Sequence, residues 1–392
     1  MSTPGDRTND GDAAPILHLV HDAAEGTVEA DDVSSESAAG APSGDATTLE
    51  QAEELLGSVD PAAYYRMLTG LVRSSHSSVL QELPYTPALP FHDPACVVVE
   101  PDPSTVETIE LYARAACPEF DRVLAAAFSD PARSDLLDAL ELLLVHEGAN
   151  VALVTNHGQV IDIALVLAGL MSAMLRDQRR YGVLDERLEV DELARRCNVL
   201  VSRMVTTRQA FNVPALQVLQ AATRTFLSVP QTANRRRAKL DPALVRANNL
   251  VMRTALDEQL ARGGQLLAMA ASGSQDLSLP ALMAKARSAW RQRRGDDPGE
   301  APTLHLQPLY DGTITLMLSC RFVLPVAISL DQATPACRVG ALTHVDDTDD
   351  CHRIMDWIAQ AHQDATGVPT IYHWHEDDLL TQVRAFLHRS GS

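Results

Sequence analysis

Long apolar runs, basic residues and paired cysteines are all scarce in this chain of 392 residues. The longest apolar run, residues 160–175, is short for a membrane span and is interrupted by Asp162. Lysine and arginine number 32 against 52 aspartates and glutamates, a net charge of −20 that argues against general nucleic-acid binding. The six cysteines include no C-x-x-C pair, so we expect reduced thiols in a cytosolic protein.

The first residues are polar and acidic, so we expect no secretory signal there. We therefore expect a cytoplasmic protein with at most a peripheral contact with a membrane.

Hydrophobic residues make up 46% of the chain, which is enough for one large domain or two ordinary ones. Residues 1–45 are rich in Asp, Glu, Ser, Ala, Gly and Pro, which predicts a disordered acidic leader. Residues 46–145 show helical spacing of apolar side chains and predict a helical N-terminal domain. Residues 146–392 mix strand-like and helix-like segments, which predicts an α/β domain with a mixed central sheet flanked by helices.

Short β-branched or apolar runs bounded by turn residues predict the strands of this α/β domain. Apolar segments rich in Ala and Leu predict helices at 161–175 and 213–223. A third helix starts at Asp241-Pro242 and stops at Gly263-Gly264, with Asp as the N-cap. The predicted strands are residues 151–154, 198–205, 225–229, 266–270, 314–318 and 322–329.

A turn that carries a histidine follows the first predicted strand. On one ideal helix, five residues rotate by roughly 500°, so His157 and Asp162 would not share a face. They can meet if His157 sits in the turn, which Gly158 makes easy, and Asp162 lies on the first helical turn. A histidine held by a carboxylate is a suitable general base, because the carboxylate fixes the tautomer and stabilises the imidazolium. The plainer alternative is a capping aspartate and a surface histidine.

Further polar and basic groups follow other predicted strands. In open α/β sheets, ligands bind at the carboxyl ends of the strands, and adjacent arginines suit a phosphate. A solvated loop is the alternative for the arginine triplet that follows residues 225–229. The candidate substrate-binding residues are Arg208, Arg235, Arg236, Arg237, Ser272, Gly273, Ser274 and Gln275.

The tail contains His373 and His375 close to several carboxylates. A His-x-His pair can bind a metal, but no third spaced ligand group is evident. A polar helix start is the simpler interpretation of residues 372–378, so we expect no metal. A metal-dependent hydrolase built on the two histidines is a weaker alternative.

Four blocks, in this order, resemble the glycerolipid acyltransferase family, whose catalytic motif is His-x-x-x-x-Asp. The closest layout is that of the soluble, plastid-type glycerol-3-phosphate acyltransferases, and the resemblance covers about residues 145–330. The blocks are residues 155–162, the arginines at 235–237 before a helix ending Arg262-Gly263-Gly264, the turn at 271–276, and the apolar strand at 322–328 with an internal proline.

The resemblance implies that His157 is the general base and that Asp162 orients it. The donor is then acyl-CoA or an acyl carrier protein, and the acceptor is a hydroxyl, most simply that of glycerol 3-phosphate in phospholipid synthesis. The arginines at 235–237 would hold the acceptor phosphate or part of CoA. Neither a cofactor nor a metal is implied.

Two positions depart from the family pattern. Gln275 stands where the family has an arginine, and Leu277 occupies the next basic position. Charge-assisted hydrogen bonds are roughly twice as strong as neutral ones, so this change weakens phosphate binding. Two alternatives stay open: an acyltransferase with a less anionic acceptor, and a catalytically inactive acyltransferase fold that binds lipid or a partner protein.

Overall fold

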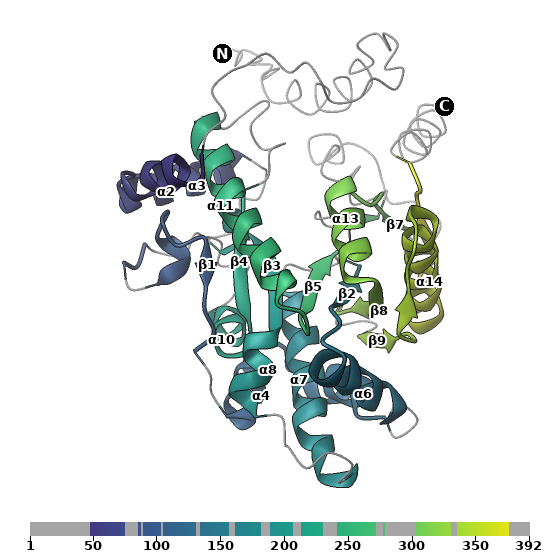
Figure 1. Ribbon diagram of the computed structural model, residues 1–392. Helices are drawn as coiled ribbons and strands as arrows, with labels where there is room; N and C mark the ends of the chain where they lie inside the picture. Colours follow the sequence, from purple (N-terminus) through teal and green to yellow (C-terminus); the bar gives the residue numbers. More distant parts are fainter. Residues whose placement is uncertain are drawn as a thin grey trace, which may run out of the picture.

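The structure, a computed structural model, describes residues 48–74, 85–87, 89–102, 105–130, 134–156, 161–181, 189–206, 213–229, 241–271, 277–278, 303–330 and 335–375. The acidic leader expected over residues 1–45 lies outside these segments. Within them the fold is mixed α/β, with helices on both faces of a central sheet, as the sequence predicts (Figure 1).

A sheet of eight strands forms the centre of the fold. Its members are β1 (Val98–Val99), β2 (Val151–Thr155), β3 (Cys197–Ser202), β4 (Arg224–Ser228), β5 (Leu266–Ala270), β8 (Phe322–Ser329), β9 (Ala336–Val339) and β10 (Thr343–His344). The order is β1-β4-β3-β5-β2-β8-β10, with β9 also paired to β8. The five strands from β4 to β8 in this order are parallel, whereas β1, β9 and β10 pair antiparallel. β2 therefore has a parallel neighbour on each side.

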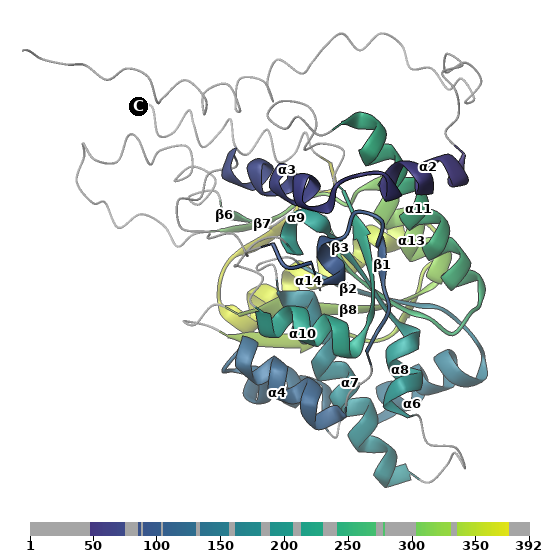
Figure 2. The same ribbon diagram turned by 90° about the vertical axis from the view of Figure 1, so that its left-hand side faces the viewer.

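The central strand β2 is apolar at four successive positions because both of its faces are buried. Val151 and Leu153 join one hydrophobic cluster, and Ala152 and Val154 join another. Successive side chains of a strand point to opposite faces, so an uninterrupted apolar run fits a sheet covered on both sides. The first cluster includes helices α4 (Val106–Ala116), α7 (Asp162–Tyr181) and α10 (Val213–Ala222); the second includes α2 (Leu49–Gly57), α11 (Pro242–Ala261), α13 (Asp311–Cys320) and α14 (Thr348–Thr366). Figure 2 shows α4, α7 and α10 together, away from α11 and α13.

The segment expected to form a helical N-terminal domain is mainly helical but shares both cores of the sheet. Ile109 of α4 lies in the first cluster with α7, and Leu56 of α2 lies in the second with α11. Strand β1 adds to the edge of the main sheet at β4. Residue 145 therefore does not separate two hydrophobic cores. The other helical elements of this segment are α3 (Pro61–Ser74), η1 (Pro90–His92), η2 (Asp121–Ala125), α5 (Ala126–Phe128), α6 (Ser134–Glu141) and η4 (Leu142–His146).

Two expectations for the C-terminal third are wrong. Residues 314–318, expected as a strand, lie inside helix α13, where Leu316, Met317 and Cys320 are buried at helical spacing. A polar helix start was expected within residues 372–378, but Tyr372 ends strand β11 (Thr370–Tyr372), which pairs parallel with β7 (Leu304–Leu306); residues 376–378 lie outside the described segments. Both misreadings involve short apolar or polar runs whose partners are distant in sequence. β7 also pairs with β6 (Leu277–Ser278), and helices α8 (Val190–Arg196) and α9 (Arg203–Thr206) flank β3.

The caps predicted for α11 are confirmed. Asp241 is the N-cap, and its side chain accepts a hydrogen bond of 2.8 Å from the Ala243 N–H, with Pro242 at the first helical position. Gly263 and Gly264 follow the helix with positive φ angles of 72° and 64°. Among the described helices, none combines the length and the apolar character needed to cross a membrane.

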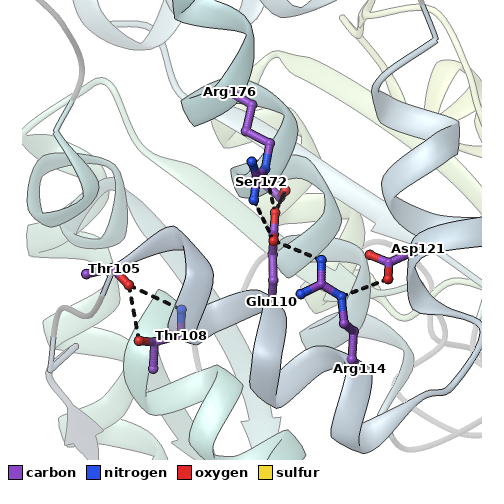
Figure 3. A network of polar contacts seen from close by, with 7 residues as sticks. All are labelled: Thr105, Thr108, Glu110, Arg114, Asp121, Ser172 and Arg176. Carbon is purple, nitrogen blue, oxygen red and sulfur yellow. Dashed lines mark hydrogen bonds and ion pairs between the residues drawn. The ribbon is translucent and has the colours of Figure 1, made fainter.

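A buried carboxylate, Glu110, joins α4 to α7 (Figure 3). Its Oε1 accepts hydrogen bonds from Ser172 Oγ (2.5 Å) and Arg176 Nε (2.7 Å), and its Oε2 accepts from Arg176 Nη2 (2.6 Å) and Arg114 Nη2 (3.0 Å). Burial by itself raises the pKa of Glu110. The hydrogen bonds from Arg176 and Ser172 outweigh burial and lower that pKa to about 2. The ionised carboxylate therefore holds the two helices together at neutral pH.

Replacing Glu110 with glutamine is expected to remove an acid-labile part of the stability. The folded-state pKa of about 2 lies below the ordinary value of 4.5, so the contribution is complete above pH 4.5 and disappears as the pH falls towards 2. Because Arg114 and Arg176 are partly exposed, we expect a loss of about 2 kcal/mol in the free energy of unfolding at pH 7. Urea unfolding over this pH range measures it, with the exposed Glu107→Gln on the same helix as the control. A deficit in Glu110→Gln that stays constant with pH would contradict this account.

Candidate active site

The carboxyl ends of parallel strands meet at one edge of the main sheet. Thr155, the last residue of β2, lies in register with Ala270, the last of β5. Ser202, the last of β3, lies in register with Ser228, the last of β4. The chain therefore leaves four strands at a common edge, called here the carboxyl edge, where open α/β sheets bind their ligands.

Most of the candidate residues lie outside the described segments, although the strands that precede them are described. The residues outside are His157, Arg208, Arg235, Arg236, Arg237, Ser272, Gly273, Ser274 and Gln275. Asp162 is described, and so is Asn156, the neighbour of His157. These two residues define the supports of the proposed catalytic turn on either side.

Asn156 extends the β2–β8 ladder through its side chain. Its Nδ2 donates to the Ile328 carbonyl oxygen (2.9 Å), and its Oδ1 accepts from the Ile328 N–H (2.8 Å). The amide thus acts like one more peptide unit paired with the neighbouring strand. On the other side, the Ala271 N–H donates to the Thr155 carbonyl oxygen (3.0 Å). Asn156 is buried, so the residue before His157 starts from a rigid position.

Asn156→Ala is expected to destabilise the fold by about 2–4 kcal/mol, because the N–H and C=O of Ile328 would both lose a buried partner. Asn156→Asp keeps an acceptor for the Ile328 N–H but places a carboxylate against the carbonyl oxygen, so its loss should be at least as large. Chemical denaturation measures both variants. A cost below 1 kcal/mol for Asn156→Ala would mean that the amide does not stabilise the strand end.

Asp162 is the first residue of α7, and only 1% of its surface is exposed. This is the first-turn position that the motif spacing predicts. A carboxylate at a helix N-terminus is stabilised by the positive end of the helix dipole. Asp162 also lies near the end of α4: burial is the main cause of the raised pKa of the Cys117 thiol, and the charge of Asp162 adds to it. The Asp162 carboxylate thus lies at the N-terminus of α7 and close to the C-terminal end of α4.

Arg203 lies directly after β3 at the carboxyl edge and is fully buried. Its Nε donates to Asn248 Oδ1 (2.7 Å), and its terminal nitrogens donate to the carbonyl oxygens of Asp93 (2.9 Å), Pro94 (3.1 Å) and Cys96 (2.6 Å). These acceptors are all neutral, so no carboxylate in the described part of the chain contacts the guanidinium. Burial lowers the pKa of Arg203. A lone arginine after a strand carries no sequence signal, which is why sequence reasoning missed this cation.

His373 of the tail packs against a second histidine, His305, from a distant part of the chain. His373 Nε2 lies 2.8 Å from His305 Nδ1, and their ring planes are 14° apart with centroids separated by 5.1 Å. Burial, with the charge of His373 next in size, lowers the pKa of His305 to about 4, so His305 is neutral at physiological pH. Within the described ranges, no group of three or more His, Cys, Asp or Glu could hold a metal.

No family model matches this chain, and no curated protein matches it either. The structural features that bear on function are therefore the strand ends, Asn156, Asp162 and Arg203 at the carboxyl edge.

Proposed function

We propose that the protein is an acyltransferase that moves a fatty acyl group from acyl-CoA or an acyl carrier protein to a hydroxyl acceptor. In this proposal His157 is the general base and Asp162 orients it. One observation carries the proposal: Asp162 is buried at the first residue of α7, the helix that follows the central strand β2 in the chain. A His-x-x-x-x-Asp motif needs its carboxylate there, because on a continuous helix the two side chains would point apart.

The proposed chemistry is base-catalysed acyl transfer. His157 takes the proton of the acceptor hydroxyl while the oxygen attacks the thioester carbonyl carbon. The tetrahedral intermediate collapses to the ester, and the departing thiolate recovers the proton from the imidazolium. Asp162 stabilises that imidazolium and fixes the tautomer in which the free nitrogen faces the acceptor. A general base of this kind contributes about 10²–10⁴-fold to the rate.

The rigid supports on both sides of the turn favour this role. Asn156 is paired with β8, and Asp162 belongs to a helix that packs in the core. Catalytic groups must be held to within about 0.5 Å of their productive positions, and such precision comes from elements of the scaffold. The arrangement suits a reacting histidine better than a surface histidine in a free loop.

The charge at the carboxyl edge determines which acceptor binds. The buried Arg203 places a positive charge beside the end of β3, and the arginines at 235–237 follow β4, which favours a phosphorylated acceptor such as glycerol 3-phosphate. Gln275, in place of the family arginine, favours a less anionic hydroxyl acceptor such as a glycolipid or polyol. Arg236→Ala distinguishes the two, because it should raise the KM for glycerol 3-phosphate and leave that for a neutral acceptor unchanged.

Thiol release from palmitoyl-CoA by the purified protein, with and without glycerol 3-phosphate, tests the proposal. Release that requires an acceptor and His157 supports acyl transfer. If no acceptor, charged or neutral, promotes release from either acyl-CoA or an acyl carrier protein, the enzymatic proposal is wrong. Lipid that co-purifies with the protein would then indicate an inactive acyltransferase fold that binds lipid.

A further inference from the structure

A polar cavity lies at the edge of the main sheet opposite the carboxyl edge, where β3, β4 and β5 begin. Its volume is about 330 Å³, and it lies among the end of α8, the start of β4, the end of α11 and the start of β5. Figure 2 shows α8 and α9, which precede and follow β3, at opposite ends of that strand. The cavity is therefore separate from the carboxyl edge. Its polar lining includes Arg195, Arg196, Arg224, Arg262, Gln259 and Gln265.

Two of the four arginines are held in place by neighbouring groups. Arg196 Nη2 lies 2.8 Å from Glu192 Oε1, while its Nη1 donates to the carbonyl oxygens of Leu144 (2.8 Å) and Gly264 (3.2 Å). Arg224 is buried, with its Nη2 2.8 Å from Glu100 Oε2. Their guanidinium groups thus form a fixed wall of the cavity.

The other two arginines have charge to offer a ligand. Arg195 lies 3.6 Å from Asp191, with both side chains largely exposed, and such a pair is weak. Arg262 is exposed and forms no ion pair with any described residue. The ion-pair partners of these four arginines are the carboxylates of Glu192, Glu100 and Asp191. The group therefore carries one net positive charge (4 − 3 = 1), although the chain as a whole has a net charge of −20.

The inner side of the cavity is polar and rests on a buried amide network. Gln265 Oε1 accepts hydrogen bonds from Gln259 Nε2 (2.6 Å) and Asn198 Nδ2 (3.0 Å). Asn198 is fully buried and lies in register with Arg224 of the next strand, yet its Oδ1 has no hydrogen-bond partner. Asn198 itself is enclosed behind Gln265, so Gln265 and Gln259 form the polar surface next to the arginines.

We propose that this cavity binds a small phosphorylated molecule. The guanidinium groups of Arg262 and Arg195 contact the phosphate, because planar N–H donors match its oxygens in geometry and charge. A cavity of this volume accommodates a small-molecule ligand. This site is independent of the proposed acyl transfer, since it lies at the other end of the strands.

Isothermal titration with inorganic pyrophosphate, at constant ionic strength, tests the site in the full-length protein. Arg262→Gln removes an exposed side chain that has no ion-pair partner among the described residues, so the variant should fold normally. We expect saturable binding by the unaltered protein and an affinity about tenfold weaker in Arg262→Gln, or about 1.4 kcal/mol, since the variant loses a charge-assisted hydrogen bond to the phosphate. Arg246→Gln is the matched control: Arg246 is exposed on the same helix, more than four turns away.

Arg236→Ala separates this cavity from the carboxyl edge. Pyrophosphate binding that survives Arg236→Ala and weakens in Arg262→Gln supports the cavity. Binding that is unchanged in Arg262→Gln but lost in Arg236→Ala would overturn this inference and assign the anion to the carboxyl edge. Absence of saturable binding by the unaltered protein would also overturn it. Neither result depends on whether the protein releases thiol from acyl-CoA.

Discussion

His157→Ala is expected to lower acceptor-dependent thiol release from palmitoyl-CoA by about 10²–10⁴-fold, the usual contribution of a general base. The substitution removes the group that takes the acceptor proton, whereas the strand before it and the helix after it keep their contacts. Asn156 remains paired with Ile328, and α7 keeps its core contacts, so the melting temperature should stay within a few degrees of the unaltered protein. Initial rates under saturating acyl-CoA and thermal unfolding measure the two effects.

Two further variants separate the base from its support. Asp162→Asn keeps the size of the side chain but removes its charge, so we expect a rate loss of about 10²-fold or more, because the imidazolium formed in the reaction loses its stabilising carboxylate. His146→Ala removes an exposed imidazole from η4 and should leave the rate unchanged. Equal activity in His157→Ala and His146→Ala would show that His157 is not the base.

Gly264→Ala is expected to cost about 3 kcal/mol or more in the free energy of unfolding. Gly264 has a φ of +64°, which costs an L-residue about 1–2 kcal/mol. A Cβ there would also lie 2.5 Å from Arg196 Nη1, and closer still to the Leu144 carbonyl oxygen. Neither neighbour can move cheaply, since Arg196 donates to that same carbonyl and to Gly264 itself. Overlap of this kind adds about 1–3 kcal/mol.

Gly367→Ala is the matched control for this loss. Gly367 has a φ of +70°, but a Cβ there would meet no atom within 4 Å. Its substitution therefore reports the backbone cost alone, about 1–2 kcal/mol. Chemical denaturation of both variants measures the difference. If the two substitutions cost the same, the close approach of Leu144 and Arg196 does not contribute to stability.

Local sequence was sufficient to predict the secondary structure of segments whose own residues determine their conformation. The four apolar residues that begin β2 predicted a buried strand, and Asp241 with Pro242 predicted the start of α11. The pair Gly263-Gly264 predicted the end of that helix, because glycine readily adopts positive φ. The spacing of the motif placed Asp162 on a first helical turn, where the structure has it.

The secondary structure of short runs that lack helix caps or turn residues at their ends was ambiguous. Residues 314–318 contain both β-branched and apolar side chains and fit either a strand or a helix by composition. Packing of Leu316 and Met317 in the second hydrophobic cluster accompanies the helical form. Thr370 to Tyr372 became a strand through pairing with β7, some 65 residues earlier in the chain. Propensity cannot anticipate such partners, because tertiary contacts outweigh differences of a few tenths of a kcal/mol per residue.

The sequence by itself determined the α/β class, the central strand, the caps of α11 and the order of the motif that carries His157 and Asp162. Only the tertiary structure decided that Asn156 pairs with Ile328, that Arg203 is buried among neutral acceptors, and that four arginines gather at the start of the strands. The physical reason is the distance along the chain between the residues that interact. Strand, turn and cap signals arise from neighbouring residues, whereas burial and side-chain hydrogen bonds depend on segments far apart along the chain that meet only when both faces of the sheet are covered.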